Sequence, residues 1–182
     1  MDGELIPDPV PPGDTVAHVT VPFPPSTPLR GKHTSLVPLT TDHTDSLFKH
    51  LGGPSNAAIW TFLPVPAPQT REAMAAIIEK FTSTTQDPQY FAVLSSSDTG
   101  AEAVGIICYM AVIPEHRRLE VAWVVFGNVL QRTKQATEAF YLILDRAFSL
   151  GYARVEWKAN SLNEPSLSAA RRLGFTFEGL FR

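Results

Sequence analysis

The chain has 182 residues, a size that fits one domain, and its 44% hydrophobic and 18% charged residues are typical of soluble globular proteins. A net charge of −3, with the basic residues scattered, argues against nucleic-acid binding. No apolar run reaches the ~20 residues that span a bilayer and no secretory signal is visible, so we expect no membrane association and a cytoplasmic protein. The single cysteine, Cys108, lies in an apolar pattern, which favours a core thiol in a reducing compartment.

The N-terminal segment is rich in proline. Eight of the sixteen prolines fall before residue 30. Because proline fixes φ and lacks an N–H donor, this arm is expected to form neither a helix nor a central strand. We therefore expect an extended or disordered lead-in over residues 1–31, followed by one folded domain over residues 32–182.

The residue pattern from residue 32 onward predicts strands and helices, whose helix ends are marked by caps such as Thr70 and by glycines such as Gly151. In chain order the pattern gives a strand at 33–37, a helix at 42–51, a short helical turn within 56–63, a helix at 70–82, strands at 90–94, 103–112 and 119–126, a helix at 134–150, a strand at 154–159, a helix at 164–173 and a strand at 176–181. Hairpins come first and helical crossovers later. This predicts a three-layer α/β/α domain with a mixed, partly antiparallel sheet of about six strands and four helices.

Two helices open directly after strands. The first opens within Gln131–Glu138 and the second within Asn163–Ser166. A helix N-terminus carries free N–H groups and about half a positive charge, so two such starts on one sheet indicate a site for a phosphate-bearing cofactor. The alternative is two ordinary capped helices, with Thr133 and Asn163 as the caps.

The second half of the chain carries a recognisable series of motifs. In order they are Leu119–Trp123, Leu130–Thr133, Ala136–Ala139, Gly151–Lys158, then Asn163, Ser166 and Ala169, and Leu173–Gly179. By their order and spacing they resemble the GNAT superfamily of acetyl-CoA-dependent N-acetyltransferases, in particular the branch related to ribosomal-protein N-terminal acetyltransferases. The resemblance covers about residues 32–182.

The resemblance implies acetyl-CoA as the acetyl donor. The family's cofactor loop aligns with Gln131, Lys134 and Ala136, and lysine replaces the first glycine of the family pattern. Backbone N–H groups of this loop would hold the pyrophosphate, and the pantetheine arm would lie between strands 119–126 and 154–159, which part in this family. The residues implied in cofactor binding are Trp123, Val124, Val125, Gln131, Arg132, Thr133, Lys134, Ala136, Thr137 and Asn163.

Acetyl transfer to an amine requires that the amine lose a proton, because amines are mostly protonated near pH 7. Glu120, a charged residue on an apolar strand, is the candidate base. The alternative is a surface glutamate paired with Arg117 or Arg118, and Glu156 is the alternative carboxylate. Many relatives use a tyrosine as the acid for the leaving thiolate, but Ala170 stands at that position here. Ser166 is the candidate substitute, or else a packing residue.

The acceptor is indicated only by class. If the family layout holds, Trp60 and Leu63 form part of the acceptor wall; the alternative is a hydrophobic lid on the core. The acceptor would be a small-molecule amine or a protein N-terminus, attacking the thioester directly in a ternary complex. No metal is implied.

The C-terminal end differs from the family pattern. The chain stops after the predicted sixth strand, where the family adds a seventh, so we expect a truncated domain with an open sheet edge. A homodimer, a partner chain or the Pro-rich arm would cover it. Two alternative functions follow: a degenerate, non-catalytic domain that binds coenzyme A or a protein, and an unrelated α/β domain that binds another phosphate.

Overall fold

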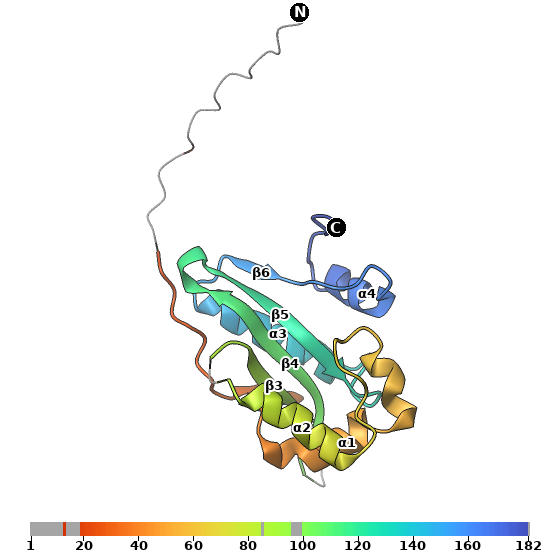
Figure 1. The fold of residues 1–182 in the computed structure, drawn as a ribbon. Coiled ribbons are helices and arrows are strands. Elements are labelled where there is room, and N and C mark those ends of the chain that lie inside the picture. Colours follow the sequence, from red (N-terminus) through yellow and green to blue (C-terminus); the bar gives the residue numbers. More distant parts are fainter. Residues whose placement is uncertain (1–12, 14–18, 85, 96–99, 182) are drawn as a thin grey trace, which may run out of the picture.

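The computed structural model describes residues 13, 19–84, 86–95 and 100–181. Its centre is one six-stranded sheet whose spatial order follows the sequence from first strand to last (Figure 1). Neighbouring strands are antiparallel except for the last pair, which is parallel. The strands are β1 (Leu29–Arg30), β2 (Thr34–Pro38), β3 (Gln89–Ser95), β4 (Ala103–Ile113), β5 (Arg118–Phe126) and β6 (Arg154–Glu156).

Four α-helices and three short 3-10 turns connect the described strands. The α-helices are α1 (Thr44–Leu51), α2 (Arg71–Thr82), α3 (Lys134–Ser149) and α4 (Glu164–Arg172). The 3-10 turns are η1 (Thr41–His43), η2 (Pro54–Trp60) and η3 (Pro114–His116). None of the described helices combines the length and the apolar character needed to cross a membrane.

The two faces of the sheet bury two separate hydrophobic cores. On one face, residues such as Leu36, Ile107 and Leu119 pack against Phe140 and Ile143 of α3. The other face packs against α1 and α2, and its core is formed by residues that include Leu47, Leu51, Met74, Ile78, Ile106 and Cys108. Figure 1 shows α1 and α2 on one side of the sheet and α3 on the other. The expected three-layer architecture and the core position of Cys108 are therefore confirmed.

The sheet has the expected number of strands but not the expected members. The strand predicted at 176–181 is wrong: this segment forms no strand, and its apolar side chains Phe177, Leu180 and Phe181 are 73%, 72% and 86% exposed. The sixth strand is instead β1, which lies inside the proline-rich arm and pairs with β2. The strand predicted at 154–159 ends at Glu156. The alternation of apolar and polar residues could not predict these strands correctly, because a strand also needs a neighbouring strand with which to pair.

The described part of the arm packs on the domain. Val21 and Leu29 are each only 5% exposed and belong to the core on the α3 face. Two hydrogen bonds fix the backbone before β1: the Gln89 side-chain amide donates to the Pro24 carbonyl at 3.0 Å, and the Tyr152 hydroxyl donates to the Pro22 carbonyl at 3.2 Å. Residues 19–30 thus contribute to the same folded unit as the sheet.

Candidate active site

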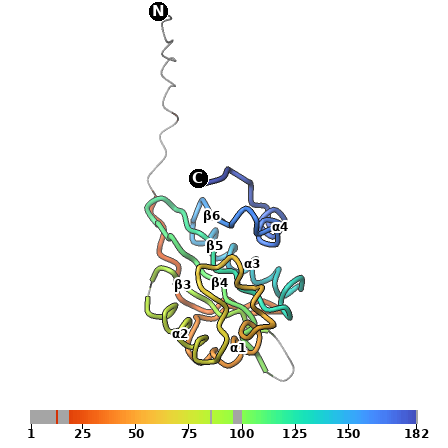
Figure 2. Tube along the Cα trace, turned by 45° about the vertical axis from the view of Figure 1, so that its right-hand side comes forward, coloured from red at the N-terminus to blue at the C-terminus, as the bar shows by residue number. Residues whose placement is uncertain are grey.

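The strands β5 and β6 lie together over a short stretch and then part. They pair at three positions, the last of which joins Glu120 to Glu156. β5 continues along β4 to Phe126, whereas the chain after β6 leads away toward α4 (Figures 1 and 2). From residue 121 onward, no described strand pairs with the edge of β5 that faces β6. An extended ligand can add to such an edge through backbone hydrogen bonds.

A bulge interrupts β5 just beyond the point of parting. Ile106 of β4 pairs with Val125, and Cys108 pairs with Ala122, so two residue steps on β4 face three on β5. Within this bulge Trp123 has a φ of 49°, which is rare for a bulky residue. Its ring packs edge-on against Phe81 and Tyr90. Bulges of this kind redirect backbone groups and are frequent next to active sites.

The turn before α3 is held by its own hydrogen bonds. The Gln131 side-chain amide donates to the Phe126 carbonyl at 2.7 Å, and Arg132 has a φ of 60°. Thr133 caps the helix, because its hydroxyl oxygen accepts the Ala136 N–H at 3.1 Å. The predicted cap is confirmed, and it occupies one amide of the first turn.

A surface pocket of about 680 Å³ opens at this turn. Its cations, Arg132 and Lys134, suit a phosphate ligand. Arg172 of α4 also approaches, and its guanidinium donates to the Thr137 hydroxyl at 3.4 Å. The Glu138 carboxylate is engaged by three backbone N–H groups. The lining consists of His33, Arg132, Thr133, Lys134, Thr137, Glu138 and Tyr141. The residues present therefore fit a diphosphate.

Asn163 and Ser166 both have structural partners at the start of α4. The Asn163 side-chain oxygen accepts the Ser166 N–H at 3.3 Å, which is the predicted N-cap. The Ser166 hydroxyl oxygen accepts the indole N–H of Trp157 at 3.0 Å. Trp157 itself packs against Phe140 of α3 and against Phe175. Ser166 therefore lies on the α3 side of the sheet.

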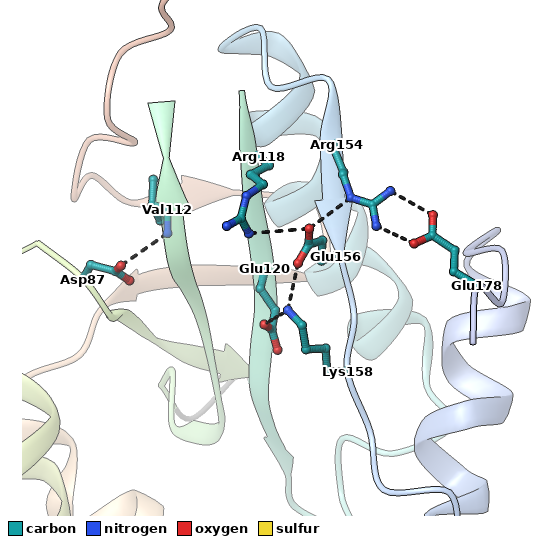
Figure 3. Close-up of polar contacts among 8 residues, drawn as sticks. All are labelled: Asp87, Val112, Arg118, Glu120, Arg154, Glu156, Lys158 and Glu178. Carbon is teal, nitrogen blue, oxygen red and sulfur yellow. Dashed lines mark hydrogen bonds and ion pairs between the residues drawn. The ribbon is translucent and has the colours of Figure 1, made fainter. Parts of the chain in front are cut away.

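Glu120 lies on the opposite face. Its strand neighbours Leu119 and Val121 belong to the core under α3, so strand alternation turns Glu120 toward the α1 and α2 side. It is 8% exposed, and its carboxylate accepts a hydrogen bond from the Lys158 ammonium at 2.5 Å (Figure 3). The alternative of a surface glutamate paired with Arg117 or Arg118 is wrong. The structure brings Glu120 together with Lys158 and Glu156, and not with Ser166.

These three residues belong to a six-residue ion network (Figure 3). Lys158 also bonds Glu156 at 2.8 Å. Glu156 is further paired with Arg154 at 3.0 Å and with Arg118 at 3.6 Å, and Arg154 reaches Glu178 at 2.5 Å. The three cations balance the three carboxylates.

Proton affinities in the network follow from these contacts. The hydrogen bond from Lys158 is the main cause that lowers the pKa of Glu156, and it outweighs the opposing effect of burial. Partial burial would lower the pKa of Lys158, but the bonds to Glu120 and Glu156 outweigh it and raise that pKa above its ordinary value. Lys158 is therefore a firmly charged ammonium near neutral pH.

The predicted acceptor wall lies beside η2. Trp60 is 3% exposed, belongs to the core under α1 and α2, and donates its indole N–H to the Leu51 carbonyl at 2.8 Å. Leu63 is half-buried. Both line a second pocket, of about 560 Å³, formed with Ala57, Thr61 and the run Pro64–Ala67. Trp60 thus packs in the core and also borders a hollow on the surface.

Comparison with models of known protein families identifies the domain. The model of the acetyltransferase (GNAT) domain matches residues 33–176. The chain belongs to the GNAT acetyltransferase family. It is thus an acyltransferase, and the alternative of an unrelated α/β domain is wrong.

Solved structures of GNAT proteins resemble the chain over most of its length. A GCN5-related N-acetyltransferase from Brucella melitensis is 33% identical, with a TM-score of 0.84 over 90% of this chain and 73% of the other. A probable acetyltransferase of the GNAT family from Chromobacterium violaceum is 32% identical, with a TM-score of 0.82 over 94% and 85%. The comparison with curated proteins gave no match.

The expected branch also has a structural neighbour. The Salmonella typhimurium acetyl transferase that modifies the N-terminal serine of ribosomal protein L7/L12 has a TM-score of 0.64 over 84% of this chain and 86% of its own. At 14% identity it shows the GNAT fold alone.

Two residues of the candidate site are not indicated as such by the sequence. Lys158 stands in a family motif and Arg172 in a predicted helix, and neither pattern gives them a partner. Their partners, Glu120 and Thr137, lie 38 and 35 residues away in the sequence. For Lys158 the sequence does contain a signal. It lies two residues after Glu156 on a strand that is expected beside Glu120, so its side chain is expected on the same face as that of Glu156.

Proposed function

We propose that this GNAT domain transfers the acetyl group of acetyl-CoA to a primary amine, which attacks the thioester directly in a ternary complex. The observation that carries the proposal is the parting of β5 and β6 immediately after the Glu120–Glu156 pair. β5, the strand from which β6 parts, leads along the chain to the turn before α3. An open pocket lies at that turn, where Arg132 and Lys134 stand at the N-terminus of the helix. A long ligand with a diphosphate at one end and a thioester at the other suits this combination.

In this proposal the chain holds the donor at three places. The N–H groups around Lys134, together with the side chains of Arg132, Lys134 and Thr137, hold the diphosphate. Gln131, Thr133 and Ala136 shape the turn through the hydrogen bonds described above. The bulged segment formed by Trp123, Val124 and Val125 pairs with the pantetheine arm, and the Asn163 amide borders it.

The bound donor supplies an acetyl group activated as a thioester. The Glu120 carboxylate orients the incoming amine and receives its proton, directly or through water. Backbone N–H groups of the bulge at Trp123 face the oxygen that gains negative charge. The thiolate leaves as the amide bond forms. Ser166 keeps its own hydroxyl proton while it accepts the Trp157 N–H, and we assign it as the donor to that thiolate through water.

The acceptor in this proposal is a primary amine of a small molecule or of a protein N-terminus. The pocket bounded by Trp60 and Leu63 lies on the face of the sheet toward which Glu120 turns. Its lining combines the side chains of Trp60, Leu63 and Val65 with polar groups such as the Thr61 hydroxyl, so it can accept both apolar and polar parts of an amine. The fold neighbour that acts on a ribosomal protein makes a peptide with a free N-terminal serine a reasonable member of an acceptor panel.

The test combines binding with turnover. Acetyl-CoA at ~100 times its dissociation constant should stabilise the protein by about 2.7 kcal/mol in thermal unfolding. A panel of small amines and N-terminal peptides should then release free thiol with at least one acceptor. Stabilisation without thiol release would overturn the proposed transfer to a primary amine while leaving the cofactor site in place. Absence of stabilisation would overturn the proposed cofactor site.

A further inference from the structure

We propose that Lys158 is a positioning residue for acetyl transfer: its ammonium holds the Glu120 carboxylate in place at the point where β5 and β6 part. The inference rests on the proposed function, since Glu120 is the proposed proton acceptor. Lys158 follows β6 by two residues and therefore stands on the side of the gap opposite Glu120. Its ammonium bridges the two sides of the gap at its narrow end (Figure 3).

The ion network is asymmetric in a way that singles out Lys158. Glu156 is paired with three cations, Arg118, Arg154 and Lys158. Within the described part of the chain, Glu120 is paired with Lys158 alone. Loss of Lys158 would therefore leave Glu156 with two arginines, but Glu120 without any cation.

Burial makes this loss consequential for Glu120. The Glu120 side chain is 10% exposed, whereas that of Lys158 is 41% exposed. A carboxylate removed from water favours its neutral form unless a cation or hydrogen-bond donors compensate. The groups that face Glu120 are Lys158, Glu156 on β6 and the Cys108 thiol on β4, whose pKa is raised mainly by burial and further by the Glu120 charge. Without Lys158, the nearest charge is another carboxylate, which also favours protonation of Glu120.

A purely structural salt bridge would have different properties. Exposed ion pairs contribute little to stability, and their removal does not change which protonation state a neighbour adopts at neutral pH. Here the lysine is half exposed while its partner is buried, so the pair mainly compensates the burial of the partner's carboxylate. The consequence is a pH profile that depends on the charge at position 158.

The experiment compares Lys158→Met with Lys158→Arg in thiol release across pH. In Lys158→Met, the acidic limb of kcat/KM should move upward by about one pH unit, so that rates measured on that limb fall about tenfold, through kcat rather than KM. Lys158→Arg keeps the charge and should restore most of the rate and the position of the limb. Glu156→Gln leaves the Lys158–Glu120 pair in place and should not move the limb upward.

A second readout does not need turnover. In the free Lys158→Met protein, an unpaired buried Glu120 prefers to be protonated, so its stabilising contribution is lost as pH rises. Urea unfolding should show this variant losing stability relative to Lys158→Arg as pH rises from about 4 to 6, the window that a shift of about one unit above the ordinary glutamate value gives. The double variant Glu120→Gln with Lys158→Met should lose that pH dependence, which assigns it to Glu120.

The outcomes separate the two proposals. A wild-type limb position in an active Lys158→Met protein, with unfolding that follows Lys158→Arg at every pH, would overturn the role of Lys158 and leave the proposed function intact. A wild-type protein that released no thiol with any acceptor would overturn the function itself, whatever the variants did. Acetyl-CoA should stabilise all these variants as it does the wild type, because position 158 lies away from the turn at α3.

Discussion

At the scale of single residues, Glu138 connects two parts of the chain that lie about a hundred residues apart. Its carboxylate accepts the backbone N–H groups of Lys32, His33 and Thr34 at 2.8, 2.6 and 2.8 Å. This fixes the turn before β2 against the first half of α3. Burial opposes ionisation, but the three hydrogen bonds outweigh it and lower the pKa of Glu138 below its ordinary value of 4.5.

Glu138→Gln should therefore destabilise the free protein in a pH-dependent way. The neutral amide cannot replace three charge-assisted bonds, so we expect a loss of about 1–3 kcal/mol in unfolding free energy at pH 7. A lowered folded-state pKa gives stability that is present above pH 4.5 and is lost as pH falls through the folded value. Chemical unfolding from pH 7 to pH 3 should show the two proteins converging at the acidic end.

The matched control is Glu79→Gln, which neutralises an exposed glutamate on α2. It should leave the unfolding free energy within about 0.5 kcal/mol of the wild type. Equal effects of the two substitutions would show that the bonds from 32–34 to Glu138 add no stability of their own.

At the scale of elements, two electrostatic preferences conflict at the start of α3: that of the helix dipole and that of an anionic ligand. Lys134 is the first residue of the helix, where the macrodipole favours a negative charge over a positive one. A cation at this position is unfavourable for the free helix and favourable for an anionic ligand. The charge of Lys134 therefore costs the free helix some stability, and it would favour the diphosphate of the proposed function.

Lys134→Glu should separate these preferences. We expect the thermal stability of the free protein to be kept or slightly raised, while the dissociation constant for acetyl-CoA rises about tenfold. The effect on binding should shrink as salt increases, because exposed charges are screened. Calorimetric titration at low and high salt measures it.

The control is Lys80→Glu, which makes the same charge change near the end of α2. Lys80 is not among the residues that line the pocket at the start of α3. It should leave acetyl-CoA affinity unchanged. Equal weakening by both substitutions would mean that overall charge, and not the turn at α3, governs binding.

At the scale of the whole molecule, residues 19–31 of the proline-rich arm belong to the folded unit. β1 adds a strand at the edge of the sheet, and Leu29 lies in the core beneath α3. An arm that merely lies on the surface would contribute little to stability, whereas a core residue contributes several kcal/mol. The distinction bears on where the domain begins.

Leu29→Ala should destabilise the protein by about 2–5 kcal/mol in urea unfolding, because it removes buried methyl groups and leaves a cavity. Val19→Ala, at a residue that is 50% exposed, is the control and should change stability by less than about 0.5 kcal/mol. If Leu29→Ala were as mild as its control, the domain would begin after the arm, at about residue 32.

The sequence by itself determined the features that depend on local signals. The caps at Thr70, Thr133 and Asn163, the glycine after α3 and the buried position of Cys108 follow from residues close in the chain. The placement of Glu120 on an apolar strand was visible in the same way. The family resemblance supplied the expected fold, because the order of such motifs is itself a property of the sequence.

Only the tertiary structure decided which segments pair. β1 is a strand because β2 lies beside it, and 176–181 is not one, since no described strand pairs with it. The bond from Lys158 to Glu120 and the three bonds to Glu138 likewise join residues distant in sequence. The physical reason is that caps and turns are set by hydrogen bonds between near neighbours, whereas strand partners and buried ion pairs depend on which distant surfaces the whole chain brings into contact.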